Sequence, residues 1–239
     1  MSNRLKELQA RLAAAATVPN IQRAVYFKTG PGSYAEHDQF LGIKNPVLHE
    51  LAKEFCNLSL AELEQLIQSP FNEGRLLALF IATAQYKKAK AAGREEIYQW
   101  YIRNLSQVNN WNLVDASAHL IMGPHVAVHG TAVLFALVKS ESLWDRRIAM
   151  VATWHFIRLK DTQLTFTIAE LLIDDHHDLI HKAVGWMLRE AGKWNEAGLL
   201  AFLDTHAAVM PRTMLRYALE KLAPDVRARY MAAKASKKA

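Results

Sequence analysis

Apolar residues recur every three to four positions along almost the whole chain, which is the spacing of amphipathic helices. Residues 3–16 place Leu5, Leu8 and Leu12 on one such stripe. The same spacing predicts helices over 19–28, 47–55 and from residue 60, and then over 72–91, 94–106, 110–122, 129–139, 142–160, 162–173, 177–192, 195–207, 211–222 and 224–235. Strict apolar–polar alternation rich in β-branched residues is nearly absent. The pattern therefore predicts an all-α chain.

Short polar or helix-breaking segments separate these helices. They are Gly30-Pro31-Gly32 with the loop to Gln39, Ser69-Pro70, Gly123-Pro124, Ser140–Ser142 and Asp174-Asp175. Ser59-Leu60-Ala61-Glu62 has the pattern of a capping box. Trp111, Arg147 and Trp186 recur at intervals slightly below the ~40–47 residues of HEAT-type helical repeats. We therefore predict one domain over residues 1–239, an α-solenoid of HEAT-like helical-hairpin repeats with a concave face, and a frayed basic tail at 234–239. A globular helical bundle is the alternative.

Composition narrows the range of functions. Net charge is +6 and the pI is about 9.4, which favours a polyanionic partner such as nucleic acid. Cys56 is the single cysteine, so an internal disulfide and a cysteine-based zinc site are excluded. No apolar run approaches the ~20 residues of a membrane span, and the N-terminus lacks the pattern of a signal peptide. We expect a soluble, cytoplasmic protein that associates with the nucleoid when bound to DNA.

Three predicted helices carry an aromatic residue beside a charged one. Trp111 and Asp115 are four residues apart and project from one helical face. Trp186 and Arg189 are three apart, as are Trp144 and Arg147. Aromatic faces, guanidinium groups and a carboxylate together suit a cationic, phosphate-bearing partner. A core tryptophan and a solvated aspartate near a helix N-terminus would explain the first pair without function.

Other candidate chemistry is weaker. His177 and His181 have the i,i+4 spacing of a shared metal ion, but Asp174, Asp175 and Asp178 also suit helix capping, and we predict no metal site. A GxSxG motif and a glycine-rich phosphate loop are absent from the sequence, which removes support for serine hydrolase and nucleotide-binding chemistry. Gly185, beside Trp186, predicts close approach of either another helix or a ligand.

Six segments in order carry a resemblance to a known family. They are YFKTGPG (Tyr26–Gly32), FLGI (Phe40–Ile43), WNLVD (Trp111–Asp115), WDRRIAMV (Trp144–Val151), KAVGWMLRE (Lys182–Glu190) and PRTMLRYALEKL (Pro211–Leu222). Through them the chain resembles, over nearly its full length, the DNA alkylation repair (AlkD-like) family of HEAT-repeat DNA glycosylases. The resemblance implies base excision repair: removal of positively charged N-alkylated purines, such as 3-methyladenine and 7-methylguanine, from duplex DNA without metal or cofactor.

The resemblance also assigns residues. Asp115 takes the place of the catalytic carboxylate, and Trp111 and Trp186 take the places of the aromatic residues that flank the deoxyribose of the lesion. Arg147 and Arg189 match arginines near that site and the DNA backbone, and Tyr26 matches an aromatic residue at its rim. We expect these three residues and Lys28 to contact DNA. Asn110 departs from members with a second tryptophan there, and the Gly30–Gln39 loop is longer than in well-known relatives; both bear on substrate range.

The family resemblance further implies that contacts fall mainly on the DNA backbone. Nothing in the sequence suggests more than a monomer, and we expect no obligate protein partner. The competing hypothesis is a non-catalytic α-solenoid that binds DNA or protein partners. That hypothesis predicts that Trp111, Asp115, Trp186 and Arg189 point into the core or apart from one another.

Overall fold

The computed structural model describes residues 2–17, 26–36 and 38–232. Within these ranges the chain is all-α, and the single β-type pairing is an isolated bridge between Gln39 and Phe71. The predicted start of a helix near Pro19 and the predicted tail at 234–239 lie outside the described residues. No helix in the described ranges is long and apolar enough to cross a membrane.

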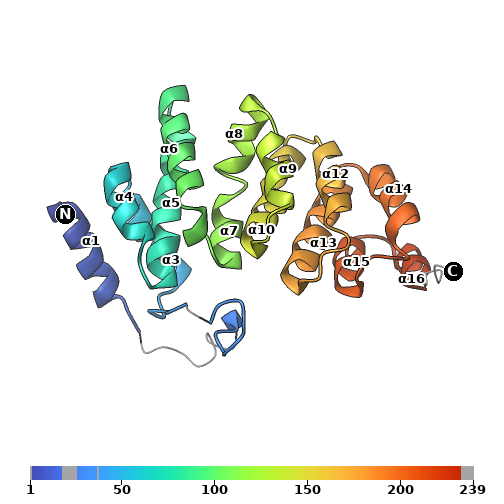
Figure 1. Cartoon of the computed structure of the whole chain (residues 1–239), viewed down its shortest axis with the longest axis horizontal. Coiled ribbons are helices and arrows are strands. Elements are labelled where there is room, and N and C mark those ends of the chain that lie inside the picture. Colours follow the sequence, from blue (N-terminus) through green and yellow to red (C-terminus); the bar gives the residue numbers. More distant parts are fainter. Residues whose placement is uncertain (1, 18–25, 37, 233–239) are drawn as a thin grey trace. The chain divides into compact units, whose positions relative to one another are not determined.

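Internal contacts divide the chain into two compact units, Met1–Ile121 and Met122–Ala239. A single domain over the whole chain stays a prediction. In both units successive helices pack as hairpins (Figure 1), so the predicted all-α fold of stacked helical hairpins is confirmed. The concave DNA-binding face stays a prediction.

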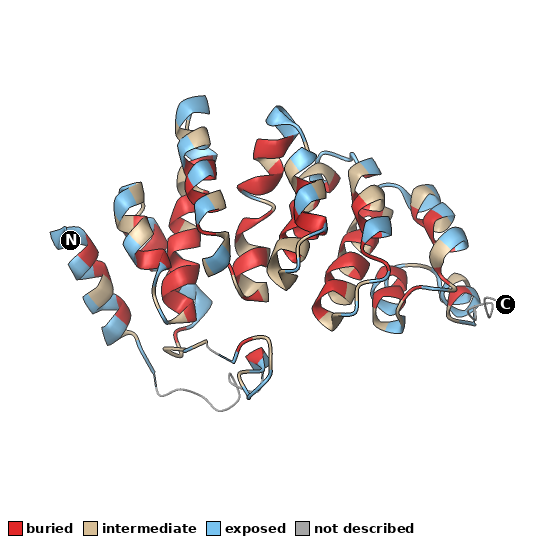
Figure 2. Ribbon diagram, in the orientation of Figure 1, coloured by how far each residue is buried: buried red, intermediate tan, exposed pale blue. Residues whose placement is uncertain are grey.

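The first unit is arranged around one long helix, α5. Its elements are α1 (Asn3–Ala14), α3 (Asn45–Glu54), α4 (Leu60–Ile67), α5 (Asn72–Lys88), α6 (Ala91–Arg103), the 3-10 turn η1 (Leu105–Gln107) and α7 (Trp111–Ser117). Helix α5 contacts α3, α4, α6 and α7. It is buried over much of its length (Figure 2), because apolar side chains cover most of its circumference.

The second unit is arranged around α13. Its elements are α8 (Met122–His129), α9 (Ala132–Val138), α10 (Leu143–Ala152), α11 (Trp154–Arg158), α12 (Gln163–Leu171), α13 (Asp178–Gly192), α14 (Glu196–His206), α15 (Arg212–Leu219) and α16 (Pro224–Ala232). Helix α13 contacts α10, α11, α12, α14 and α15. This helix carries two of the predicted site residues, so its packing decides where they point.

A local sequence signal fixes the start of α4 as predicted. The Ser59 side chain accepts a hydrogen bond from the backbone N–H of Glu62, and the Glu62 carboxylate accepts one from the Ser59 N–H at 2.7 Å. This is the predicted capping box at the start of α4, and it satisfies two backbone donors that the helix itself leaves unpaired.

Gly185 marks a close helix contact. A Cβ atom added there would lie 2.5 Å from the carbonyl oxygen of Met214 and 2.5 Å from the Cβ of Tyr217, both on α15. Only a residue without a side chain lets the two helices approach this closely. Of the two sequence explanations for Gly185, close helix packing is the one that the structure supports.

Two predicted helix boundaries were wrong. The helix predicted over 110–122 ends at Ser117, and the predicted break at Gly123-Pro124 lies inside α8. Proline is tolerated in a first helical turn, where its missing N–H has no intrahelical partner. Gly123 serves packing rather than chain reversal, since an added Cβ would lie 2.5 Å from the Cβ of His155.

The helix predicted over 142–160 is in fact two, α10 and α11, which join at Thr153. The Thr153 hydroxyl is buried and donates to the carbonyl of Met150 at 2.7 Å. A threonine side chain that bonds to the preceding turn competes with the helical ladder and bends the chain. The apolar spacing continues across this bend, so periodicity alone did not reveal it.

Candidate functional site

The first part of the predicted site lies on the short helix α7. The helix begins at Trp111 because Asn110 caps it: Asn110 is extended (φ −149°, ψ 154°), and its side-chain oxygen accepts a hydrogen bond from the Trp111 N–H at 2.7 Å. Trp111 and Asp115 then stand one turn apart on the same face. Asp115 lies in the second turn of a short helix rather than in the middle of a long one, so its poor helix propensity costs little.

Four rings form an aromatic cluster around Trp111: Tyr26, Phe27, Phe40 and Trp111. Phe27 lies between two near-parallel rings, 4.6 Å from Phe40 (28°) and 5.2 Å from Trp111 (13°), measured between centroids. Tyr26 meets the Trp111 ring edge-on at 5.5 Å and 77°. Phe27 is buried, whereas Tyr26 is 65% exposed. The cluster therefore fixes the plane of the Trp111 indole and leaves the Tyr26 ring at the surface.

A buried polar network, the Asp38 network, holds α7 in place; its members are Asp38, Asn72, Arg75, Asn110 and Asn112. The Asp38 carboxylate forms an ion pair with Arg75 and accepts hydrogen bonds from the side-chain amides of Asn110 (2.5 Å) and Asn72 (3.1 Å). Asn72 and Asn112 also bond to each other through their amides, at 2.7 and 3.3 Å. A buried carboxylate is tolerated when it is paired and hydrogen-bonded in this way. Asn110 thus caps α7 and ties it to Asp38.

The segment that carries Phe40 is fixed by a second buried carboxylate. Glu73 on α5 is buried, and its two oxygens accept hydrogen bonds from the backbone N–H groups of Leu41 and Gly42, each at 2.9 Å. Gly42 has φ = 79°, in the left-handed region that glycine adopts without strain. Glu73 therefore holds an irregular stretch of backbone in one conformation against α5.

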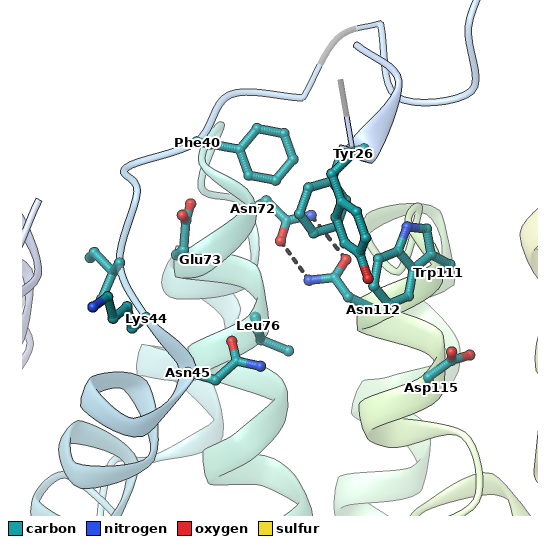
Figure 3. A pocket seen from close by; sticks show the side chains of 12 residues that line it. Tyr26, Phe40, Lys44, Asn45, Asn72, Glu73, Leu76, Trp111, Asn112 and Asp115 are labelled. Carbon is teal, nitrogen blue, oxygen red and sulfur yellow. Dashed lines mark hydrogen bonds between the residues drawn. The ribbon is translucent and has the colours of Figure 1, made fainter. Parts of the chain in front are cut away.

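These elements line a cavity of about 700 Å³ in the first unit, and the cavity is open to solvent. Its lining residues are Tyr26, Phe27, Phe40, Ile43, Lys44, Asn45, Asn72, Glu73, Leu76, Trp111, Asn112 and Asp115. Figure 3 shows Trp111 and Asp115 on one side and Lys44 and Asn45 on the other. The structure thus brings the sequence candidates Tyr26, Trp111 and Asp115 into one cavity.

Lys28 does not line this cavity. It follows the helical turn of Tyr26 and Phe27, is exposed, and has φ = 51°, in the left-handed region. A non-glycine residue is uncommon there. Its contact with DNA stays a prediction.

In the second unit, Trp186 and Arg189 lie on α13. Trp186 is half-buried and meets the ring of Trp154 edge-on, with centroids 5.0 Å apart and planes at 65°. The Arg189 guanidinium forms ion pairs with Glu220 and, at 3.3 Å, with Glu190. The hydrogen bond from Arg189 holds the pKa of Glu220 below its ordinary value.

Arg147 has a different environment from the one expected of a DNA-contacting residue. It is 4% exposed, and its Nη1 donates to the carbonyl of Leu179 on α13 at 2.5 Å. This contact joins α10 to the start of α13. Its neighbour Arg146 bonds to Asp175 at 2.6 Å and to the carbonyls of Ser140 and Glu141. Contact of Arg147 with DNA stays a prediction, and the structure supplies a packing role for the residue.

The histidines around the start of α13 bond to the backbone there, and His177 is the N-cap of this helix. The Nδ1 of His177 accepts a hydrogen bond from the Leu179 N–H at 3.1 Å, and the Nε2 of His181 lies 2.5 Å from the carbonyl oxygen of Asp175. One nitrogen of each ring is therefore occupied within the protein. Burial lowers the pKa of His177, and this effect exceeds the opposing influence of the Asp175 carboxylate.

The sequence candidates therefore fall into two groups. Tyr26, Trp111 and Asp115 share a cavity in the first unit, and Trp186 and Arg189 share α13 in the second. Convergence of these groups into one site stays a prediction. Phe27 and Phe40, which complete the aromatic cluster, were not predicted as site residues, although the adjacent aromatic pair at 26–27 was a usable signal.

Comparison with known proteins agrees with the fold. A sequence profile described as "DNA alkylation repair enzyme" matches residues 7–222. No curated protein matched the chain. A solved structure described as a predicted DNA alkylation repair enzyme from Enterococcus faecalis is similar, with a TM-score of 0.65 and 20% sequence identity, covering 85% of this chain and 94% of that one. At this identity the structural likeness shows the fold alone.

The profile covers nearly the whole chain, including both units and every residue predicted for the site. A role in the repair of alkylated DNA follows at the level of the family. The chain belongs to the DNA alkylation repair enzyme family.

Proposed function

We propose that the protein is a DNA glycosylase that hydrolyses the N-glycosidic bond of positively charged N-alkylated purines in duplex DNA. One observation carries the proposal: the Asp115 carboxylate and the Trp111 indole line the same cavity, and Trp111 is held there by packing and by the cap of its helix. An acidic group beside an aromatic face suits a reaction in which a sugar becomes cationic.

The chemistry follows from the charge on the substrate. Alkylation at a ring nitrogen makes the purine cationic, so it departs with the electron pair of the glycosidic bond without a strong general acid. The deoxyribose is left oxocarbenium-like, as in glycoside hydrolysis. Asp115 stabilises that cation and orients the water that adds to the anomeric carbon, and the water's proton passes to Asp115 or to solvent. The products are the free base and an abasic sugar.

The two tryptophans would add to this stabilisation. A cation over an indole face gains about 0.5–2 kcal/mol, depending on how far the site excludes water. Phe27 already stacks on one face of Trp111, so the opposite face is the one we assign to the sugar. Trp186 would act in the same way from α13.

Basic residues would hold the backbone of the DNA. Arg189 is half-buried in its ion pairs with Glu220 and Glu190, so a phosphate would have to exchange with a carboxylate. Lys28 and Tyr26 are exposed, and Tyr26 also lines the cavity. Arg147 would act mainly by fixing α13 through Leu179, with any phosphate contact secondary to that role. Phosphate contacts of this kind position the protein on the duplex without recognising its base sequence.

The direct test is release of 3-methyladenine and 7-methylguanine from alkylated duplex DNA, measured under single turnover. Asp115→Asn should lower the rate at least about 100-fold, the effect of losing one preorganised electrostatic group, while DNA binding changes little. Asp174→Asn is the matched control, because Asp174 is an exposed aspartate in the second unit. Unchanged release by Asp115→Asn, or absence of release by the unmodified protein, would overturn the proposal.

Binding should depend steeply on salt. Each phosphate neutralised contributes about −0.9 to the slope of log affinity against log salt on B-form DNA. Three basic contacts, from Lys28, Arg147 and Arg189, would give a slope of about −2.7. An affinity for duplex DNA that does not change between 50 and 200 mM salt (about the range in which such contacts are usually measured) would contradict backbone binding.

A further inference from the structure

The turn between α5 and α6 carries a concentration of positive charge. Residues 85–99 hold four basic and two acidic side chains. The four bases are all exposed and form what we call the α5–α6 basic patch: Lys87, Lys88, Lys90 and Arg94. One of the two acids, Glu95, accepts a hydrogen bond from the Gln99 side chain at 2.9 Å. The turn is therefore a local excess of positive charge on the surface of the first unit.

The lysines of the patch are not neutralised by neighbouring carboxylates. None of the three forms an ion pair with another residue that the structure describes. Exposed lysines of α13 behave differently. Lys182 pairs with Asp178 at 2.7 Å, and Lys193 pairs with Glu190 at 2.6 Å. The three ammonium groups of the patch are therefore available to an anion from outside the protein.

Arg94 is the member of the patch that the protein itself orients. Its Nε donates a hydrogen bond to the carbonyl of Tyr86 at 3.3 Å, and its guanidinium carbon lies 5.6 Å from the centroid of the Tyr86 ring. Tyr86 is buried, so this contact holds the guanidinium against the end of α5. The described part of the chain gives its two Nη groups no acceptor, and they too can bind an outside anion.

Helix stability explains only half of this arrangement. Lys87 and Lys88 lie in the last turn of α5, where positive charge is favourable. Lys90 and Arg94 lie at the start of α6, where the helix dipole favours negative charge. That first turn contains no acidic residue, and Lys90, in the N-cap position, makes no side-chain capping hydrogen bond. The two bases at the start of α6 therefore need a reason beyond the stability of their own helix.

The patch lies away from the cavity of the same unit. Asn72 and Glu73 line the cavity at the start of α5, whereas Lys87 and Lys88 stand at its other end. At ~1.5 Å per residue, the two ends of this helix are about 24 Å apart. Figure 1 shows the turn into α6 at the end of the first unit opposite to the segment that leads into α3. Duplex DNA is stiff over about 150 base pairs, so one short duplex does not curl around the unit from one end to the other.

The chemistry of the patch fits a nucleic-acid backbone better than a protein surface. Protein interfaces are anchored by aromatic residues and arginine, and lysine is depleted in them. The large hydrophobic side chains that are exposed in the described chain all lie elsewhere, and the two tyrosines nearest to the patch, Tyr86 and Tyr98, are buried. Lysines bind phosphates as flexible point charges and do not depend on base sequence.

We propose that the α5–α6 basic patch binds the phosphate backbone of a second segment of duplex DNA, separate from the duplex at the cavity. This inference goes beyond the proposed function, since it requires neither Asp115 nor cleavage of a glycosidic bond. A protein that holds two segments at once passes from one duplex to another without first dissociating.

The test counts the duplexes bound by each protein. The full chain is titrated at low salt with a fluorescent duplex of about ten base pairs, one helical turn, and the complexes are sized by sedimentation velocity. We expect two duplexes per protein. Lys87→Gln/Lys90→Gln should lose the second duplex, and glutamine keeps the helix propensity of lysine. Lys6→Gln/Lys139→Gln is the matched control, because both lysines are exposed, belong to other helices and carry the same total charge.

Salt dependence gives a second measurement. Four neutralised phosphates would give the second duplex a slope of about −3.6 in log affinity against log salt. Any residual binding of a second duplex by Lys87→Gln/Lys90→Gln should have a slope of about −1.8, because two bases of the patch remain. The control variant should keep the slope of the unmodified protein.

Three results would overturn the inference: one duplex per unmodified protein, two duplexes on Lys87→Gln/Lys90→Gln, or equal loss in both double variants. Displacement of the second duplex by an acidic polypeptide at lower concentration than by DNA would assign the patch to an acidic protein instead. Base release from alkylated DNA is measured in parallel and should not change in Lys87→Gln/Lys90→Gln. Two bound duplexes without release would refute the proposed function and leave the patch assignment standing, and release with one bound duplex would do the reverse.

Discussion

Replacing Asp38 with asparagine tests the buried network that positions α7. The Arg75 guanidinium would lose its only carboxylate in this network while remaining 3% exposed. It would keep hydrogen bonds to the carbonyls of Ser69 (2.9 Å) and Pro70 (3.2 Å). Breaking a buried ion pair from one side costs about 3–5 kcal/mol. Because those two bonds remain, we expect Asp38→Asn to lower the free energy of unfolding by about 3 kcal/mol.

The chain offers an internal rescue. Asn110→Asp alone would place a second carboxylate in contact with Asp38, whose oxygen lies 2.5 Å from the Asn110 amide nitrogen. In the double variant Asp38→Asn/Asn110→Asp the roles are exchanged: the amide at position 38 donates to the carboxylate at position 110, which still accepts from the Trp111 N–H. One negative charge remains near Arg75. The double variant should therefore be more stable than the sum of the two single losses predicts.

Urea denaturation of the four proteins gives the coupling energy directly. We expect a coupling of at least about 1.5 kcal/mol, within the ~0.5–3 kcal/mol seen for residues in one network. Asp174→Asn combined with Asn110→Asp is the control pair, and its effects should add. Additive losses in the Asp38–Asn110 pair would refute the network as a structural unit. Base release should recover with stability in the double variant.

Three further outcomes follow from packing and titration. In urea denaturation, Gly185→Ala should lower the free energy of unfolding by about 1–3 kcal/mol, because the added methyl meets the Met214 carbonyl at 2.5 Å. Gly93→Ala on α6 should leave that free energy unchanged or raise it, because the nearest contact of the added methyl is a side-chain atom at 3.3 Å. Burial lowers the pKa of His177 below 6.5, so the unfolded chain takes up a proton first and stability is lost as pH falls below 6.5 toward the folded pKa. This loss of stability includes the hydrogen bond that His177 Nδ1 accepts from the Leu179 N–H at the helix cap. His177→Asn should therefore flatten this part of the profile of stability against pH. A slope unchanged from that of the parent protein would contradict the capping role.

The helices of this protein could be predicted well from sequence because their apolar spacing is a local property. The capping box at Ser59 was found in the same way. The wrong predictions of helix boundaries concern residue types that occur in more than one structural context. Pro124 ends helices in many contexts but here lies within the first turn of α8, and Thr153 bends a helix without interrupting its apolar stripe.

The site was only partly predictable, for a different physical reason. Trp111 and Asp115 are one turn apart, so their shared face follows from helix geometry. The hydrogen bond of Asn110 with Asp38 joins positions 72 residues apart, and no local pattern announces it. Arg147 shows that a local pattern can also suggest a role that the structure does not support. Its residue type and spacing suggested a DNA contact, whereas its burial and its hydrogen bond to Leu179 give it a packing role.

The long sequence separation across the Asp38 network has a consequence for the order of folding. Helices and hairpins join near neighbours and form early, whereas closing a long loop must lose chain entropy before the distant contact repays it. The bond between Asp38 and Asn110 therefore forms after the helices it connects. We expect hydrogen exchange to show the backbone amides of Leu41 and Gly42 opening at lower free energy than those in the middle of α5, because their acceptor is the Glu73 side chain and not the backbone of a regular helix. A ligand bound in the cavity would raise the free energy of this local opening. Ligand binding would therefore stabilise the same region that forms last in folding.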